Sequence, residues 1–351
     1  MHTAAALAAL SLLTSTALAQ TPSLTLFQPD SGAIGTSLRD LSRGSGRVLA
    51  FNFQQPVGQF TWTPTEGRRA YSTLGALGVS SDGRSFVGGL NGTLAVDRAG
   101  VTQSIGTPAG RTLDTDTFNL WVGDNGGYAI GNFQSGTDRK PFKWTQADGW
   151  QQIGGPSLLV TRVRDVTPDG NAMIGLAQDF NDGFHYLYRE GQGFTNLGTL
   201  QASGLNDDGT RVVGSRTFGP TVATVAVVWN NGVQTDLPTP AGFASATCID
   251  LTNDGSMIVG QLTFPGFMST TGFVWTPDRG TRTITDFAAE YGIIFPAHTL
   301  LTDIRVSSDG RTIAGSIEGF NFANTFALTI PSPSTAIIAG VALFAANRRR
   351  R

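Results

Sequence analysis

Five aspartates that each precede a glycine are the side chains of this sequence best suited to acid–base or metal chemistry. Gathered around one axis, such carboxylates would form an array able to act on a glycosidic bond. The Asp-Gly pair is also a strong signal for a tight turn, in which the aspartate bonds its own backbone. Because they recur once per repeat, we interpret them, with one Asn-Gly pair, as structural turns. The turn residues are Asp82, Gly83, Asn125, Gly126, Asp169, Gly170, Asp208, Gly209, Asp254, Gly255, Asp309 and Gly310.

Two further acidic segments, 179–183 (DFNDG) and 114–116 (DTD), are candidates for a loop-bound calcium ion. Neither has the alternating spacing and distant Glu of a helix–loop–helix calcium site. The three histidines, His2, His185 and His298, are too isolated for a metal cluster or a catalytic triad. Nucleophile-elbow, phosphate-loop and dinucleotide motifs are absent from the sequence. We therefore predict no catalytic, cofactor-binding or metal residue, with loop-bound calcium as the alternative.

Basic residues offer a different chemistry. Arg162 and Arg164 have the period-two spacing that places side chains on one face of a strand. Such a face could bind an acidic glycan. The pairs Arg68-Arg69 and Arg139-Lys140 are expected to be solvated loop charges.

The elements that must position these residues form a repeat. The turn glycines, counted from a degenerate unit at Gly46, are separated by 37, 43, 44, 39, 46 and 55 residues. A period near 44 residues is typical of four-stranded propeller blades. A helical solenoid is excluded, because no segment between the repeats keeps a 3.6-residue hydrophobic period. A second glycine follows the turn glycine by five residues in the six clear copies. We expect it to allow a close backbone approach or a bulge.

An aromatic strand follows most turns. Its first and third residues share one face, so their rings are expected to pack between neighbouring blades. Units without this pattern contain Leu94-Ala95-Val96 and Phe326-Ala327-Leu328. The aromatic copies are Phe60-Thr61-Trp62, Phe142-Lys143-Trp144, Tyr186-Leu187-Tyr188, Val227-Val228-Trp229 and Phe273-Val274-Trp275.

These units resemble the HAF-type extracellular repeat family, most closely at 196–200 (NLGTL) and 205–214 (LNDDGTRVVG). The resemblance covers most of residues 40–330 and implies a repeat-built β fold without a known activity. We predict an all-β propeller of about seven four-stranded blades, with six as the alternative. Residues 23–27 (SLTLF) are expected to close the ring as the fourth strand of the last blade, because a free edge invites aggregation. Residues 284–292 are the one predicted helical insertion, placed over one end of the ring where repeat proteins often bind ligands.

The N-terminal segment has the features of an export signal. An apolar stretch, 4–13, leads to a small-x-small cleavage site at Ala17 and Ala19, before Gln20. Its n-region lacks Lys and Arg. We predict a signal peptide over residues 1–19, removed by signal peptidase.

The C-terminal segment combines three ordered features, which are a proline motif, a short apolar run at 335–346 and four terminal arginines. The run is shorter than the ~20 residues that span a bilayer, and the arginines suit the cytoplasmic side. The segment 331–351 resembles PEP-CTERM sorting tails, although Ser332 stands where that family has Glu. The resemblance implies transient inner-membrane anchoring and cleavage by an exosortase-type enzyme; an uncut anchor is the alternative. The tail residues are Pro331, Pro333, Arg348, Arg349, Arg350 and Arg351.

Composition agrees with an exported body at residues 20–330. The 351-residue chain has only 14% charged residues, 45 glycines and a net charge of −2. Without the four terminal arginines, 20 basic residues face 26 acidic ones, a net charge of about −6. This balance argues against nucleic-acid binding, and the single Cys248 excludes an intramolecular disulfide.

Two functions fit the sequence. We favour a cell-surface or extracellular protein without enzymatic activity, which serves adhesion, matrix assembly or binding of a glycan or protein. The alternative is a secreted propeller glycan hydrolase or lyase whose carboxylates come from separate blades around the axial mouth.

Overall fold

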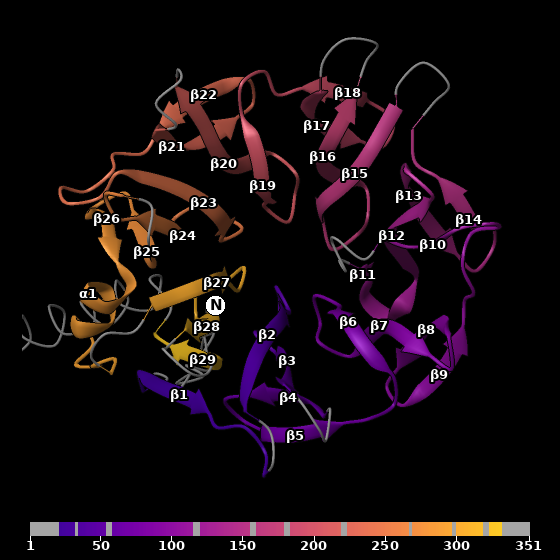
Figure 1. The fold of residues 1–351 in the computed structure, drawn as a ribbon, viewed down its shortest axis with the longest axis horizontal. Coiled ribbons are helices and arrows are strands. Elements are labelled where there is room, and N and C mark those ends of the chain that lie inside the picture. Colours follow the sequence, from indigo (N-terminus) through magenta and orange to yellow (C-terminus); the bar gives the residue numbers. More distant parts are fainter. Residues whose placement is uncertain are drawn as a thin grey trace, which may run out of the picture.

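The computed structural model describes residues 21–31, 34–53, 58–114, 120–154, 159–178, 183–218, 223–266, 269–296, 300–318 and 323–331. These residues form seven antiparallel sheets arranged in a ring around a central axis (Figure 1). The protein is therefore a seven-bladed β-propeller, which decides between the six and seven blades that the sequence allowed. We number the blades in chain order, with the innermost strand of each lying at the axis.

The first three blades follow one another along the chain. In the third, two short strands, β10 and β11, share the edge of β12, and a 3₁₀ turn at Asp124–Gly126 separates β11 from β12. Blade 1 contains β2 (Gly35–Leu41), β3 (Val48–Phe53), β4 (Gln59–Thr63) and β5 (Gly67–Tyr71). Blade 2 contains β6 (Gly75–Val79), β7 (Ser85–Leu90), β8 (Thr93–Arg98) and β9 (Val101–Ser104). Blade 3 contains β10 (Thr112–Leu113), β11 (Leu120–Val122), β12 (Tyr128–Ser135), β13 (Asp138–Thr145) and β14 (Gly149–Gln152).

The remaining blades repeat this order. Blade 4 contains β15 (Leu159–Val166), β16 (Ala172–Gln178), β17 (Gly183–Arg189) and β18 (Gly193–Asn196). Blade 5 contains β19 (Gln201–Leu205), β20 (Arg211–Phe218), β21 (Ala223–Asn230) and β22 (Val233–Asp236). Blade 6 contains β23 (Ser245–Leu251), β24 (Ile258–Thr263), β25 (Thr270–Thr276) and β26 (Gly280–Thr283). Blade 7 contains β27 (Leu300–Val306), β28 (Thr312–Glu318), β29 (Ala323–Thr329) and the N-terminal strand β1 (Ser23–Phe27).

Blade 7 closes the ring with strands from both ends of the body. Strand β1 pairs antiparallel with β29, in a register that runs from Ser23 opposite Thr329 to Phe27 opposite Thr325. This pairing confirms the closure predicted from the sequence. The side chains of Leu24 and Leu26 also pack against the core of blade 7, so β1 adds apolar burial as well as backbone hydrogen bonds.

In blades 2, 4, 5 and 6 the second glycine of the repeat lies where the backbones of the two innermost strands approach closely, whereas Gly131 and Gly315 face side chains. A Cβ atom on Gly175 would clash with the backbone oxygen of Arg162 on the inner strand. The same clash would occur at Gly214 and Gly260, against Gln201 and Thr247. The predicted close backbone approach is confirmed, and it explains why the repeat requires glycine there.

Aromatic side chains of the third strand pack between blades, as predicted. Phe60 and Trp62 are buried in a cluster with Phe27 of β1 and Ala327 of β29. Blade 2 differs by one residue from the triplet that the sequence suggested. Ala95 pairs with Gly88, and Asp97 then occupies the position of the tryptophan. The buried Asp97 carboxylate accepts hydrogen bonds from the Tyr71 hydroxyl (2.9 Å) and the Gly100 N–H (2.7 Å), and these two bonds make its burial tolerable.

Helix α1 (Ile284–Ala289) lies at the outer rim beside β26 rather than over one end of the ring (Figure 1). The N-cap Thr283 hydroxyl accepts the Asp286 N–H at 3.1 Å. Buried Ile284 and Phe287 join the core of blade 7, which explains the position of the helix. The helix predicted within 284–292 is confirmed, but its predicted position over one end of the ring was wrong, because its apolar face covers the seam between blades 6 and 7. Within the part of the chain that the structure describes, no helix has the length and apolarity needed to cross a membrane.

Candidate functional site

The innermost strands carry irregularities that turn side chains toward the axis. In blades 1, 2, 4, 5, 6 and 7 the pairing of the first two strands shifts register. Such shifts locally re-aim the backbone and occur often beside functional sites. Three of these bulges place an aspartate at the same position, two residues before the turn. These residues are Asp40, Asp165 and Asp250, from blades 1, 4 and 6.

Each of these carboxylates joins its own blade to the next one. Asp40 accepts the N–H of Leu41 in its own strand at 2.9 Å. Its other oxygen accepts the N–H of Val79 in blade 2, also at 2.9 Å. Both oxygens are therefore used in backbone hydrogen bonds. Asp165 likewise accepts the N–H groups of Val166 at 2.9 Å and Leu205 at 2.8 Å. Asp250 accepts those of Leu251 at 2.9 Å and Val306 at 3.1 Å.

Blades 2 and 5, which donate two of these hydrogen bonds, have a glycine at the position where blades 1, 4 and 6 have the aspartate. A Cβ on Gly78 would clash with the backbone oxygen of Leu120 in blade 3. A Cβ on Gly204 would clash with the backbone oxygen of Ile249 in blade 6. Aspartate and glycine thus act together at the axis. The aspartate accepts a hydrogen bond from the next blade. The glycine of that next blade then lets the backbone of the blade following it approach closely.

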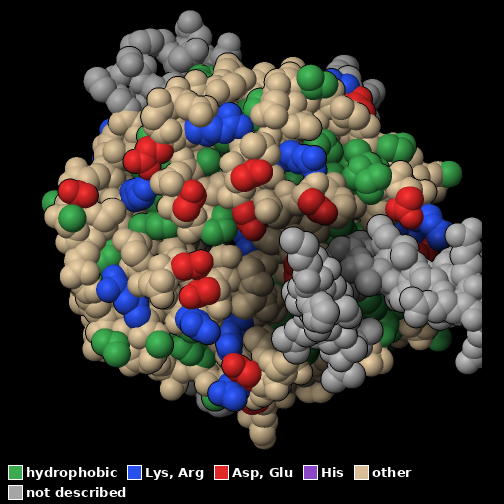
Figure 2. All heavy atoms as spheres, turned by 180° about the vertical axis from the view of Figure 1, so that it is seen from behind, with side chains coloured by type: hydrophobic (Ala, Val, Ile, Leu, Met, Phe, Trp, Pro, Cys, Tyr) green, Lys and Arg blue, Asp and Glu red, His purple; other side chains and the backbone are tan. Residues whose placement is uncertain are grey.

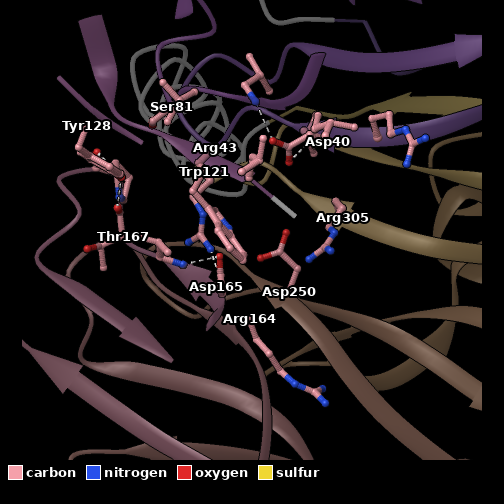
Figure 3. A pocket seen from close by; sticks show the side chains of 18 residues that line it. Asp40, Arg43, Ser81, Trp121, Tyr128, Arg164, Asp165, Thr167, Asp250 and Arg305 are labelled. Carbon is pink, nitrogen blue, oxygen red and sulfur yellow. Dashed lines mark hydrogen bonds and ion pairs between the residues drawn. The ribbon is translucent and has the colours of Figure 1, made fainter. Parts of the chain in front are cut away.

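Arg43, in the first turn of blade 1, crosses the axis to the opposite side of the ring (Figure 3). Its guanidinium donates to the Asp165 carboxylate and to the backbone oxygen of Leu205, and it lies 3.3 Å from the Asp207 carboxylate. The backbone oxygen of Arg43 also accepts the N–H of Ser308 in blade 7 at 2.8 Å. This one residue therefore connects blades 1, 4, 5 and 7.

Burial and charge oppose each other at these groups. Burial raises the pKa of Asp40 to about 6, although two backbone N–H groups and the positive charge of Arg305 favour its ionised form. Burial also raises the pKa of Asp250. Although burial disfavours the charged form of Arg43, nearby Asp165 and Asp250 hold its pKa above the usual range. The axis is thus a network of charges that compensate one another.

A cavity of about 80 Å³ lies beside Arg43 along the axis. Besides the groups already described, Arg39, Arg164, Arg305 and the half-buried Trp121 line it. Arg164 points away from the carboxylates of Asp165 and Asp250 in Figure 3. Among the described residues none of these three arginines forms an ion pair with a carboxylate. Burial lowers the pKa of Arg39 and Arg164, because protein replaces water around them without supplying a negative charge.

The turn residues predicted from the sequence are not among the residues that line this cavity, although their neighbours Ser81 and Pro168 are, and each lies in its own hairpin. Asp169 shows the arrangement. One of its oxygens accepts the Thr167 hydroxyl at 2.6 Å and the Asn171 N–H at 3.0 Å. Asp82, Asp208, Asp254 and Asp309 make equivalent local bonds. The turn glycines Gly83, Gly126, Gly170, Gly209, Gly255 and Gly310 all have positive φ. On the face seen in Figure 2, acidic side chains gather around the centre, and most basic side chains lie further out.

The two arginines of the predicted basic face have separate environments. Arg162 lies 3.6 Å from the buried carboxylate of Asp114, whereas Arg164 lines the axial cavity. Arg68 lies on strand β5 and pairs with Asp30 at 2.8 Å, and Arg139 lies on β13. Both pairs therefore lie on strands rather than in loops, although Arg68 and Arg69 are exposed, as expected for solvated charges.

Other candidates from the sequence have structural positions or lie outside the described residues. His185 Nδ1 accepts the Ala202 N–H at 3.1 Å, and burial with the nearby charge of Arg164 lowers its pKa to about 4. Cys248 is buried. Within the described ranges, no group of three His, Cys, Asp or Glu side chains could hold a metal ion. The segment 179–182, the cleavage residues Ala17, Ala19 and Gln20, and the tail after Pro331 lie outside those ranges.

Sequence reasoning missed the axial residues. A signal was available, because Asp40, Asp165 and Asp250 each precede the turn glycine by five or six residues. It was obscured because only three of seven blades carry it. Nothing in the sequence indicated that Arg43 crosses the axis.

No protein-family model and no curated protein matches this chain. Among solved structures, it is similar to the oligogalacturonate lyase of Vibrio parahaemolyticus, with a TM-score of 0.60, 10% identity, and coverage of 89% of this chain and 98% of that one. An oligogalacturonate lyase in complex with manganese gives a TM-score of 0.58 at 12% identity, covering 89% and 97%. The β-propeller domain of the Trilobed protease from Pyrococcus furiosus gives 0.58 at 10%, covering 84% and 95%. At these identities the similarity is one of fold.

Proposed function

We propose that this protein is an exported, HAF-type binding module without enzymatic activity, displayed at the cell surface or released outside the cell. The observation that carries the proposal is the use of the axial carboxylates. Asp40, Asp165 and Asp250 each accept backbone N–H groups from two blades, and so serve to hold the ring together.

Glycan hydrolysis needs carboxyl groups that can exchange protons or attack the sugar. Two such groups must flank the scissile bond, one as acid and one as base or nucleophile. A carboxylate whose two oxygens both accept hydrogen bonds inside the scaffold is poorly placed for either role. Protonation of Asp165 would also remove the negative charge that pairs with Arg43. These features favour binding over catalysis.

The two ends of the chain supply the proposed address. We propose signal peptidase cleavage after Ala19 and transient anchoring of residues 335–346 in the inner membrane. An exosortase-type enzyme would then remove the PEP-CTERM-like tail. Mass spectrometry of the protein recovered outside the cell tests this. A mature chain that starts at Gln20 and ends near Pro331 supports it, and recovery of the intact chain from the cytoplasm contradicts it.

A binding and cleavage assay tests the function itself. The full-length chain, purified in a mild detergent because both ends are apolar, is incubated with acidic and neutral polysaccharides. The panel includes oligogalacturonate because two structural neighbours are named as lyases of that glycan. We expect a glycan or protein ligand to be retained at its original length. Cleavage of any glycan, lost when an axial aspartate is replaced, would favour the alternative of a secreted hydrolase or lyase.

A further inference from the structure

The axial cavity is lined by arginines whose charge the fold compensates only in part, because Arg305 acts on Asp40 and Asp250 from beyond ion-pair distance. Its lining has four arginines and three aspartates. All three carboxylates are used in backbone hydrogen bonds, and one of them also binds Arg43. This leaves Arg39, Arg164 and Arg305, contributed by blades 1, 4 and 7, without an ion-pair partner among the described residues. A protein with more acidic than basic side chains has therefore placed three cations around one cavity.

Unpaired guanidinium groups in a partly desolvated cavity are suited to an anionic ligand. Arg39 and Arg164 are exposed and Arg305 is half-buried, so a ligand can reach them, and its carboxylate would provide the direct negative partner that they lack. Guanidinium is also the cation best shaped for carboxylate, because its planar fork can donate two parallel hydrogen bonds. Walls of low dielectric around a cavity focus the field and concentrate ligands of opposite charge.

Two aromatic residues refine the description of the ligand. The Arg39 guanidinium lies over the Phe51 ring, 4.2 Å from its centroid, which holds the cation without neutralising it. Trp121, from blade 3, is half-buried and forms part of the cavity wall. A broad apolar ring beside cations suits a ligand that has a flat apolar face together with a carboxylate. A uronic acid residue of a glycan combines both features.

The size of the cavity limits what can enter. Drug-sized ligands occupy pockets of about 300–1,000 Å³, whereas this one has a volume of about 80 Å³. It can admit the carboxylate end of one sugar residue, with the rest of the glycan outside.

We propose that the axial cavity is a binding site for the carboxylate of a terminal uronic acid residue in an acidic glycan, held by Arg39, Arg164 and Arg305 beside Trp121. This inference rests on the proposed binding function and names the ligand class for it. It requires no bond to be made or broken.

Isothermal titration calorimetry on the full-length chain tests the site. The probes are a short oligogalacturonate, a neutral glucose oligomer of the same length, and inorganic sulfate. The variants are Arg39→Gln, Arg164→Gln and Arg305→Gln. Arg69→Gln is the matched control, because Arg69 lies on the outer strand β5 with 64% of its side chain exposed.

We expect the wild type to bind the oligogalacturonate at least about tenfold more tightly than the neutral oligomer or sulfate. Each axial variant should lose about tenfold or more in affinity, the usual effect of removing a charge-assisted hydrogen bond, and Arg69→Gln should change less than twofold. Added salt should weaken binding. Circular dichroism confirms that each variant is folded.

Three results would overturn the site. They are no uronate binding by the folded wild type, equal affinity for the uronate and neutral oligomers, and equal affinity for uronate and sulfate. Uronate binding that the axial variants leave unchanged would also overturn it, while leaving the proposed binding function intact. If the uronate is cleaved but its binding still depends on the arginines, the site is supported and the proposed non-enzymatic function is refuted.

Discussion

Replacement of Asp165 with asparagine is the sharpest test of the axial network, because asparagine has the same shape but half the acceptors. The Asp165 carboxylate faces three donors. These are the N–H groups of Val166 and Leu205, at 2.9 and 2.8 Å, and the guanidinium of Arg43. The oxygen of an asparagine could still serve Val166. Its NH₂ group would then face two donors from the other blades.

The expected cost follows from those losses. The side chains of Arg43 and Asp165 are only 16% and 9% exposed, so the guanidinium would be left partly buried without its main negative partner. Removing one partner of a buried ion pair costs about 3–5 kcal/mol, and a stranded backbone N–H costs about 1–3 kcal/mol. Because asparagine keeps one bond and the site can relax, we expect Asp165→Asn to lower the free energy of unfolding by about 3–5 kcal/mol.

Urea denaturation, followed by tryptophan fluorescence, measures this change. Asp169→Asn is the matched control, since Asp169 bonds only within its own turn and blade 3 has Asn125 at the equivalent position. It should cost less than about 1 kcal/mol. In Arg43→Met/Asp165→Asn the two changes should be non-additive by more than about 1 kcal/mol. A cost for Asp165→Asn no larger than that of its control, or additivity within error, would refute the network.

Three other outcomes are expected. Deletion of residues 20–28 removes β1, exposes β29 and should lower the melting temperature markedly; an unchanged melting temperature would refute its closing role. Gly175→Ala, which places a methyl group against an inner-strand carbonyl, should destabilise by about 1–3 kcal/mol. Gly183→Ala, whose Cβ would come no nearer than 3.8 Å to another atom, should cost much less, and equal costs would contradict the close approach. The folded-state pKa of His185, about 4, lies below the usual value near 6.5, so the unfolded chain binds more protons between these values. Its contribution to stability should be lost as the pH falls from about 6.5 to 4, and His185→Gln should remove that part of the pH dependence; identical pH profiles of the two proteins would contradict this assignment.

The repeat made much of the fold predictable from the sequence. Turn glycines such as Gly83 mark hairpins because few other residues accept positive φ, and alternation fixes which aromatic side chains face the next blade. Closure by residues 23–27 followed from the need to cover a strand edge. The position of α1 did not follow, because a short amphipathic helix can cover either an end or a seam of the ring.

The candidate site was much less predictable. Arg43 contacts Asp165 and Leu205, which lie 122 and 162 residues away in sequence, so only the closed ring brings them together. Arg162 and Arg164 were expected to act together, yet the irregular pairing of β15 gives them different environments. Local patterns predict hairpins well, whereas an axial site depends on how seven blades meet.

The most direct test of the account is to recover a bound glycan and measure its length. The full-length chain is mixed with oligogalacturonate, separated from unbound material, and the ligand is released and sized. We predict that wild type and Arg69→Gln return intact oligomer, while Arg164→Gln retains little. Recovery of shortened oligomer would contradict the proposal that this propeller binds without catalysis.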